Sequence, residues 1–255
     1  TLLAGIGYAA SLFPFHFWTP DTFEGAPVSV AAYLSVVPKI GALFVLAQVV
    51  KELPVSVIDW PLILSVLAVL SMTFGNVVAL WQDNVIRLLA YSTIAQSGYF
   101  LLGIIGMGQS GLAIDSLVVF GVAYAVMNTG AFAIAQGEGT WLDDFKGMGR
   151  RRPWQAVGMT IFLLSLVGMP PLAGFVGKFL LFGSAIESGY TWLAVIAILN
   201  SAISLAVYMR IVVPMFFQEI EKEQAKSYAP GISFVWISTF VLTIAVGLGA
   251  QWFLT

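Results

Sequence analysis

Residues 154–187, WQAVGMTIFLLSLVGMPPLAGFVGKFLLFGSAIE, decide the fold class. This stretch has 34 residues, and its only charged side chains are Lys178 and Glu187. A straight α-helix of that length would extend about 51 Å, whereas the hydrocarbon core of a bilayer is about 30 Å thick. Pro170 and Pro171 remove backbone donors and clash with the preceding turn. We therefore expect a membrane helix that breaks at Gly168, Pro170 and Pro171.

The composition of the whole chain agrees with a membrane protein. Of its 255 residues, 59% are hydrophobic and 9% are charged, and the mean hydropathy is +0.93. Soluble domains carry roughly 25% charged residues. Eleven basic against thirteen acidic residues leave no basic face for nucleic acid. The absence of cysteine excludes disulfides, thiolate metal sites and iron–sulfur clusters from this sequence.

The long charge-free runs predict an all-α, polytopic transmembrane helical bundle that forms a single membrane domain over residues 1–255. The runs are continuously apolar, whereas the lipid-facing strands of a barrel alternate between apolar and polar residues. One of the segments, 27–50, contains Lys39 near its middle, and the first and sixth are broken by proline, at Pro14 and at Pro170–Pro171. About eight membrane segments are expected, at 1–17, 27–50, 61–81, 85–107, 112–136, 154–187, 190–217 and 231–254.

The basic residues of the connecting segments predict the orientation. Alternate loops hold eight of them against Lys51 alone on the other side, so the positive-inside rule places the eight on the cytoplasmic or matrix side. They are Arg87, Lys146, Arg150, Arg151, Arg152, Arg210, Lys222 and Lys226. Thr1 and Thr255 are then expected on the non-cytoplasmic side. The alternative for Arg150–Arg152 is a lipid or partner patch. Because Thr1 stands inside an apolar run, we expect the sequence to be part of a longer chain.

Two lysines lie within predicted spans. Lys39 is near the centre of 27–50, and Lys178 follows the double proline by seven residues. A buried ammonium costs at least about 2.5 kcal/mol on insertion scales. The two lysines are therefore candidates for groups that load and release a proton. The alternative is that each stem lies along the helix and the amine reaches the interface.

Uncharged polar side chains and one histidine accompany the lysines. His16, beside the break at Pro14, is a candidate proton relay because imidazole titrates near neutral pH; a structural histidine bonded to a freed carbonyl is the alternative. The polar side chains are candidates for a hydrated route, and ordinary interhelical hydrogen bonds are the alternative. They are Ser35, Ser92, Thr93, Gln96, Ser97, Tyr124, Asn128, Ser165, Asn200, Ser201 and Ser204. The sequence contains no phosphate-binding glycine loop and no histidine metal cluster.

Four blocks of sequence resemble one known family. They are FPFHFWTPDTFEGAP at 13–27, LSVVPK at 34–39, RLLAYSTIAQSGY at 87–99 and SLVGMPPLAGFVGK at 165–178. Together they resemble the antiporter-like subunits of respiratory complex I, and most of all the N-type subunit of NADH-quinone oxidoreductase, the counterpart of mitochondrial subunit 2. The blocks occur in family order and extend from the first residues into the final third of the chain.

The resemblance implies a fourteen-helix subunit with two inverted five-helix repeats, of which this chain holds the C-terminal portion. Residues 1–50 would be the seventh and eighth helices at the end of the first repeat, 61–217 the second repeat, and 231–254 the final helix. Lys39 then matches the central lysine of the eighth helix, and Lys178 the lysine of the broken twelfth helix. One departure is Ala9, which stands where the family usually has a lysine five residues before the proline of PFH.

The implied function is proton translocation, driven by redox chemistry in other subunits of a complex I type NAD(P)H:quinone oxidoreductase. The chain itself would hold no cofactor, since NADH, FMN, iron–sulfur clusters and quinone belong elsewhere in that complex. Its partners would be other membrane subunits, including further antiporter-like ones, and its location the bacterial cytoplasmic membrane or an equivalent inner membrane. The alternatives are an Mrp-type cation/proton antiporter subunit and a non-pumping structural subunit, which Ala9 favours.

Overall fold

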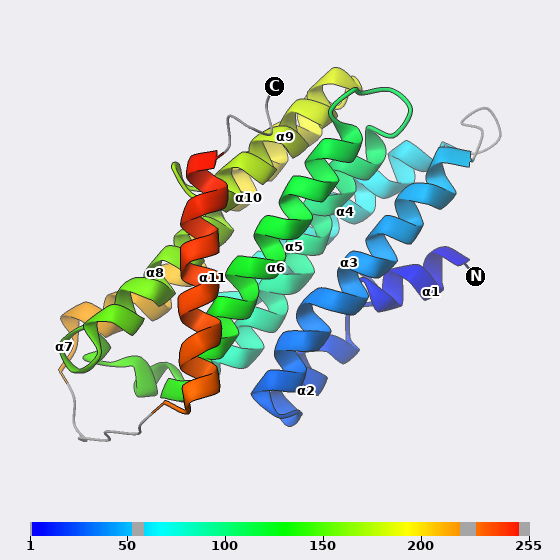
Figure 1. The fold of residues 1–255 in the computed structure, drawn as a ribbon. Helices are drawn as coiled ribbons and strands as arrows, with labels where there is room; N and C mark the ends of the chain where they lie inside the picture. The colour runs from blue at the N-terminus through cyan, green and yellow to red at the C-terminus, as the bar shows by residue number, and fades with distance from the viewer. Residues whose placement is uncertain (1, 53–58, 220–227, 250–255) are drawn as a thin grey trace.

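The computed structural model describes residues 2–52, 59–219 and 228–249. This part of the chain is all-α (Figure 1), apart from one isolated β-bridge between Asn84 and Trp141. Its elements are α1 (Leu2–Ala9), α2 (Trp18–Gly25), α3 (Val28–Glu52), α4 (Trp60–Ala79), α5 (Val85–Ile105), α6 (Ala113–Glu138), η1 (Leu142–Phe145), α7 (Met148–Arg151), α8 (Pro153–Val167), α9 (Ala173–Glu187), α10 (Thr191–Phe217) and α11 (Pro230–Leu248).

Six of the described helices are long and apolar enough to cross a membrane, namely α3, α4, α5, α6, α10 and α11. The predicted segments 27–50 and 85–107 are observed as Val28–Glu52 and Val85–Ile105. The last predicted segment, 231–254, begins as α11 at Pro230, and its residues 250–254 lie outside the described part. The all-α transmembrane bundle is confirmed, and the chain is a multi-pass integral membrane protein.

Both predicted breaks are present. The predicted segment 154–187 consists of α8 and α9, which are separated at residues 168–172. The predicted segment 1–17 consists of α1 and a turn region that contains Pro14. The exact number of membrane crossings stays a prediction, because α1, α8 and α9 are each too short to span a bilayer alone.

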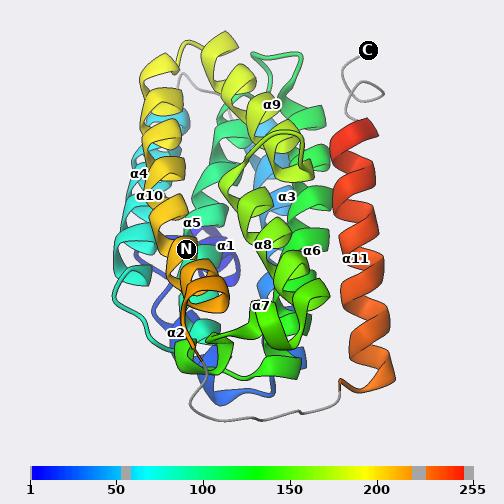
Figure 2. The ribbon, with the colours of Figure 1, turned by 90° about the vertical axis from the view of Figure 1, so that its left-hand side faces the viewer.

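The sequence pattern does not predict three short elements, α2, η1 and α7. Each has at most eight residues. Their composition is polar for this chain, because α2 contains Asp21 and Glu24 and η1 contains Asp143 and Asp144. A search for long charge-free runs cannot detect helices of this kind. They lie together at one end of the bundle (Figure 2).

Helix α5 lies at the centre of the bundle, between the other long helices (Figures 1 and 2). All of its 21 residues except Arg87 and Tyr91 are buried. A helix that is buried on every side must direct its polar side chains toward neighbouring helices. The polar residues predicted on α5 therefore lie inside the protein rather than in lipid.

Glycines allow α4 and α5 to pack closely. A Cβ at Gly75 would lie 2.7 Å from the backbone nitrogen of Ala95, and one at Gly98 would lie 2.9 Å from the carbonyl oxygen of Ala68. Small residues commonly permit such approaches between membrane helices. At Gly121, by contrast, a Cβ would come no closer than 3.7 Å to Phe44, so this glycine does not mark a close approach of that kind.

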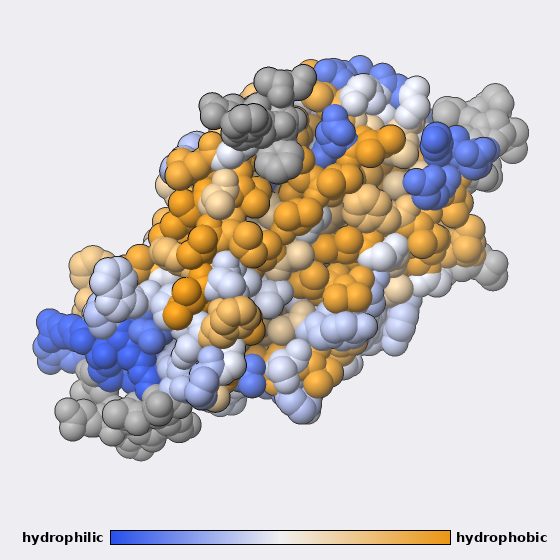
Figure 3. Space-filling model, in the orientation of Figure 1, coloured by the Kyte–Doolittle hydropathy of each residue, from blue (hydrophilic) through white to orange (hydrophobic). Residues whose placement is uncertain are grey.

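Polar side chains gather at the ends of the molecule, with apolar surface between them (Figure 3). Arg87 forms ion pairs with Asp21 at 2.6 Å and Glu24 at 2.8 Å, and Arg210 with Asp83 at 2.7 Å. The described basic residues of the predicted loops share this end, which we call the basic end: Arg87, Lys146, Arg150, Arg151, Arg152 and Arg210. Lys51 lies at the opposite end, at the close of α3. Lys222 and Lys226 are outside the described residues.

A buried carboxylate organises the basic end. The side chain of Glu138 contacts Arg151 at 2.7 Å and Arg152 at 3.0 Å. Tyr228 donates a hydrogen bond to the backbone carbonyl of Ile134 at 3.2 Å, and its hydroxyl lies 3.4 Å from Glu138 Oε2. Burial, together with the neighbouring carboxylate, raises the pKa of Tyr228, so its hydroxyl stays protonated as a donor. These contacts hold the start of α11 against the end of α6.

The close packing of α4 on α5 predicts the effect of adding one methyl group. Gly75→Ala should lower the free energy of unfolding by about 1–3 kcal/mol, because the new Cβ meets backbone atoms that cannot rotate away. Thermal denaturation of the purified full-length protein in detergent measures the change. Gly41→Ala on α3 is the control, since nothing lies within 4 Å of its Cβ position. Equal melting temperatures for the two variants would contradict the packing argument.

Candidate functional site

The break between α8 and α9 begins with a glycine in the left-handed region. Gly168 has φ +94°, a conformation that glycine adopts without steric cost. Its N–H donates to the carbonyls of Leu164 at 3.1 Å and Ser165 at 3.0 Å, and the N–H of Met169 also donates to Leu164 at 3.1 Å. This arrangement ends α8 and satisfies two of its last four carbonyls.

Side chains satisfy the other two carbonyls. Gln96 on α5 donates through Nε2 to the carbonyl of Leu166 at 3.1 Å. Lys178 on α9 donates through Nζ to the carbonyl of Val167 at 3.0 Å. A positive charge at the C-terminal end of a helix is favourable because of the helix dipole. Lys178 therefore lies where α8 can stabilise its ammonium.

Lys178 is buried, with 2% of its surface exposed. Its amine also donates to Ser201 Oγ at 3.1 Å and lies 3.8 Å from the centre of the Tyr99 ring. The Tyr99 hydroxyl in turn lies 3.0 Å from Ser201 Oγ and donates to the carbonyl of Ala197. The amine thus contacts α8, α10 and α5, and it does not reach the interface.

The break near Pro14 forms the site of the other buried lysine, Lys39. Between α1 and α2, Ser11 adopts φ 56°, a left-handed conformation that is uncommon for serine. Its hydroxyl lies 2.5 Å from Thr19 Oγ1 and accepts a hydrogen bond from the Lys39 amine. Lys39 is 1% exposed, and the rings of Trp18 and Phe23 lie 5.5 Å from its amine. Each of the two lysines therefore contacts one helix break.

Neither lysine forms an ion pair with any of the described residues, since the ion pairs found there all involve other groups. Each amine instead contacts hydroxyl groups and aromatic rings, and Lys178 also a carbonyl. Aromatic faces and neutral acceptors favour a cation only partly, without neutralising it. Gain or loss of a proton at either site therefore changes the net charge of the interior.

His16 lies beside the first break but makes few polar contacts. Its ring stacks on Phe13 with centroids 5.3 Å apart and lies 4.6 Å from Phe74 of α4. Its Nδ1 atom is buried and has no hydrogen-bond partner among the described residues. The backbone N–H of Phe13 donates to Ser71 Oγ of α4 at 3.0 Å, which fixes the peptide next to His16.

Polar residues of α3 and α6 continue inward from Lys39. Ser35 lies one turn before Lys39 on α3, so the two side chains share a face. Its hydroxyl accepts from Asn128 Nδ2 at 2.7 Å, and its carbonyl accepts from the Tyr124 hydroxyl at 2.9 Å. Asn128 Oδ1 is buried with no partner among the described residues.

The α5 residues lie between this cluster and Lys178. Thr93 on α5 lies close to the Tyr124 hydroxyl. Ser92 is 2.5 Å from the hydroxyl of Tyr208 on α10, and Gln96 is also close to that hydroxyl. Gln96 Oε1 is a second buried acceptor without a described partner. Polar contacts thus connect α3 with α6, α6 with α5 and α5 with α10 in the interior that also holds the two lysines.

Some predicted residues have local roles. Ser165 Oγ accepts from the backbone N–H of Gly174 at 3.0 Å and so holds the start of α9. Ser97 and Ser204 donate to carbonyls of their own helices, those of Thr93 and Ser201. Asn200 bonds Asn76 and Thr73 of α4 rather than a lysine.

Sequence reasoning missed several members of the site, namely Ser11, Thr19, Ser71, Thr73, Asn76, Tyr99 and Tyr208. Tyr99 and Tyr208 carried a usable signal, because a buried tyrosine hydroxyl needs a partner. Ser11 and Ser71 carried none, since their partners come from other elements.

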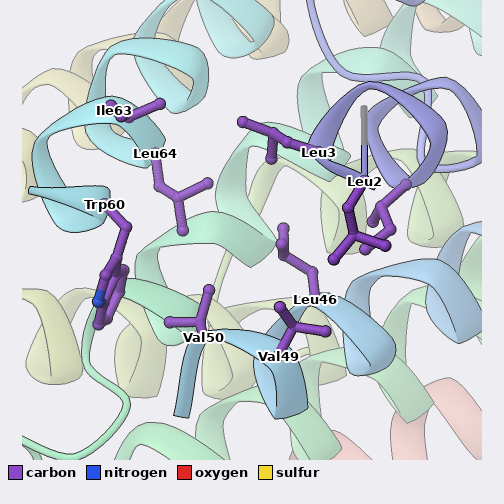
Figure 4. A pocket seen from close by; sticks show the side chains of 9 residues that line it. Leu2, Leu3, Leu46, Val49, Val50, Trp60, Ile63 and Leu64 are labelled. Atoms are coloured by element: carbon purple, nitrogen blue, oxygen red, sulfur yellow. The ribbon is translucent and has the colours of Figure 1, made fainter. Parts of the chain in front are cut away.

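An apolar pocket of about 250 Å³, shown in Figure 4, has none of these polar groups in its lining. Leu3, Leu46, Val50, Trp60 and Leu64 are among the residues that line it. Its walls contain no group that could carry a proton. Over the described ranges, no cluster of three or more His, Asp or Glu residues could hold a metal ion.

Comparison with known proteins gives consistent results. The NADH-quinone oxidoreductase subunit N of Trichlorobacter lovleyi is 44% identical over 230 residues, which are 87% of this chain and 47% of that protein. The F(420)H(2) dehydrogenase subunit N of Methanosarcina mazei is 42% identical over 245 residues, 90% of this chain and 49% of that protein. The chain thus spans about half the length of the curated relatives it matches.

A solved structure has the same fold. A chain of respiratory complex I from Thermus thermophilus with bound Aureothin superposes with a TM-score of 0.86 at 32% identity, covering 98% of this chain and 56% of that one. The family model described as NADH:quinone oxidoreductase/Mrp antiporter, TM, matches residues 1–204. The chain therefore belongs to the NADH:quinone oxidoreductase/Mrp antiporter transmembrane family.

Proposed function

We propose that this chain is a proton-translocating membrane subunit of a complex I type NAD(P)H:quinone oxidoreductase, or of a close relative with another electron donor. One observation carries the proposal. Two lysine amines are buried without carboxylate partners among the described residues, each lies at a helix break, and buried polar side chains of α3, α6, α5 and α10 contact one another in the same interior. The relatives that carry these names support the assignment.

In the proposed mechanism, a proton moves between Lys39 and Lys178 through the interior. Ser35, Tyr124 and Thr93 carry hydroxyls, which can each donate and accept, so they are suited to pass a proton. Asn128 and Gln96 each present a buried, unpartnered amide oxygen that can accept a hydrogen bond from water. Gln96 lies on α5 between Thr93 and Tyr99, whose ring contacts Lys178, and the bonded hydroxyls of Ser92 and Tyr208 adjoin this series one turn before Gln96.

His16 is proposed to exchange protons with Lys39. Imidazole is the side chain whose ordinary titration range includes neutral pH, and the buried Nδ1 of His16 has no hydrogen-bond partner among the described residues. Its backbone carbonyl accepts a hydrogen bond from the N–H of Thr19, whose hydroxyl contacts Ser11, the acceptor of the Lys39 amine. Ala9, at the end of α1, carries no ionisable group, so His16 is the titratable side chain of the first break.

We also propose that residues 1–50 end one inverted repeat, that 61–217 form the next, and that 231–254 are a final helix. The two breaks, each with its lysine, support this division. We further propose that the basic end faces the cytoplasm of a bacterial cell, that both ends of the sequence face the other side, and that other membrane subunits are the partners. NADH, FMN, iron–sulfur clusters and quinone would bind elsewhere in the complex.

Substitution of the lysines tests the function. In the intact complex, Lys178→Met and Lys39→Met should reduce proton pumping per electron about tenfold, because each removes a proton-transfer group. Lys178→Arg should be equally defective, since a guanidinium keeps its proton. Proton uptake by energised membrane vesicles is measured beside the rate of electron transfer, and Lys51→Ala is the control.

The outcomes separate the candidate functions. Normal pumping by both lysine variants would contradict the proposal and leave a structural subunit as the better assignment. Sodium-dependent exchange in vesicles without a quinone reaction would favour the Mrp-type antiporter, which the family description also names.

The orientation has its own test. Because the sequence contains no cysteine, an introduced cysteine is its only thiol. We expect Asp143→Cys, at the basic end, to react with an impermeant maleimide from the cytoplasmic side alone. Gln109→Cys, in the turn after α5 at the opposite end, should react from the other side. The reverse labelling pattern would show that the orientation is wrong.

A further inference from the structure

Helix α4 carries an asparagine that belongs to the surroundings of Lys178. Asn76 is 2% exposed, and its Nδ2 donates to the carbonyl of Asn200 at 3.1 Å and lies 3.4 Å from Asn200 Oδ1. Its side chain also lies close to the hydroxyl of Tyr99. Burial of an amide costs free energy unless the amide is hydrogen-bonded, so the hydrogen bonds of Asn76 are needed at this position.

One partner of Asn76, Tyr99, contacts the lysine amine, and the other, Asn200, directly precedes a residue that does. Asn200 directly precedes Ser201, whose hydroxyl accepts from the Lys178 amine at 3.1 Å. Tyr99 binds the same Ser201 hydroxyl at 3.0 Å and places its ring 3.8 Å from the amine. Asn76 thus lies next to Tyr99 on α5, which touches the amine, and bonds Asn200 on α10, the neighbour of Ser201, without touching the amine itself.

Asn200 is also held by hydrogen bonds that its own side chain donates. Its own Nδ2 donates to Thr73 Oγ1 at 3.2 Å and to the carbonyl of Ile196 at 3.1 Å. Thr73 and Asn76 lie three residues apart on α4, so they present one face of that helix to α10. The contact therefore fixes the distance between α4 and the part of α10 that carries Ser201.

We propose that Asn76 is a positioning residue for proton transfer at Lys178, because it holds Tyr99 and the Asn200–Ser201 turn of α10 against the lysine amine. The inference rests on the proposed function, since it assumes that the protonation of Lys178 is used. Loss of the amide would release Tyr99 and Ser201 together. The interaction of both groups with the ammonium would then weaken, and the protonation equilibrium of the lysine would change.

The test replaces the amide in the intact complex. Asn76→Leu, which has a similar shape, should lower proton pumping per electron about fivefold, as expected for the loss of about one hydrogen bond's free energy. It should also displace the pH at which pumping is half-maximal by about half a unit. Asn76→Ser keeps a hydroxyl donor and should restore part of the wild-type pH profile.

Matched variants separate positioning from general damage. Ser65→Ala on the same helix removes a buried hydroxyl that binds the carbonyl of Pro61, and it should leave pumping and its pH profile unchanged. If the complex that carries Asn76→Leu does not assemble, Asn76→Ala takes its place in the test, because it removes the same hydrogen bonds and introduces a smaller side chain. Reduced pumping with a wild-type pH profile would mean that Asn76 is merely structural and would overturn the proposal.

The proposal and the function on which it rests can fail separately. Wild-type pumping and pH profile in both Asn76→Leu and Asn76→Ala, with Lys178→Met defective, would overturn the role of Asn76 and leave the function intact. Wild-type pumping by Lys178→Met would overturn both.

Discussion

A helix that breaks inside a membrane exposes carbonyl groups that lipid cannot satisfy. At the end of α8 the chain meets this requirement with two backbone donors, one neutral amide and one amine. The position of the Lys178 amine and the conformation of the break therefore depend on each other. Movement of the α8 end would change the surroundings of the ammonium, and a change in its protonation would alter the bond to Val167.

The first break follows the same principle with different parts. Here the lysine comes from the neighbouring helix α3, and its acceptor is the hydroxyl of Ser11, which the backbone presents in a left-handed conformation. Ser71 of α4 accepts from the peptide of Phe13 in this break, while Asn76 of the same helix contacts the Lys178 surroundings. Helix α4 thus contacts the first break directly and the surroundings of Lys178 through α5 and α10.

Hydropathy and proline predicted the long helices and both breaks because these depend on composition along one segment. The elements that these two signals missed, such as α2, are short and polar, and they lie at the end of the bundle. Lys39 and Lys178 were predictable because a charge in an apolar run is conspicuous. Asn76 and Ser11 were not, since their importance comes from partners on other helices. Hydrogen bonds between helices depend on how the helices pack, and the pattern of residues along one segment holds no information about that packing.

The chain itself offers a comparison between a structural donor and an ionisable one. Gln96 satisfies the carbonyl of Leu166 with a neutral amide, while Lys178 satisfies the next carbonyl, that of Val167, with an amine. A glutamine-like donor is therefore sufficient to cap a carbonyl at this break. An ammonium in the same place carries a desolvation cost that the amide does not. A subunit with only a scaffold role gains nothing from that cost, whereas a proton carrier requires a group whose charge can change.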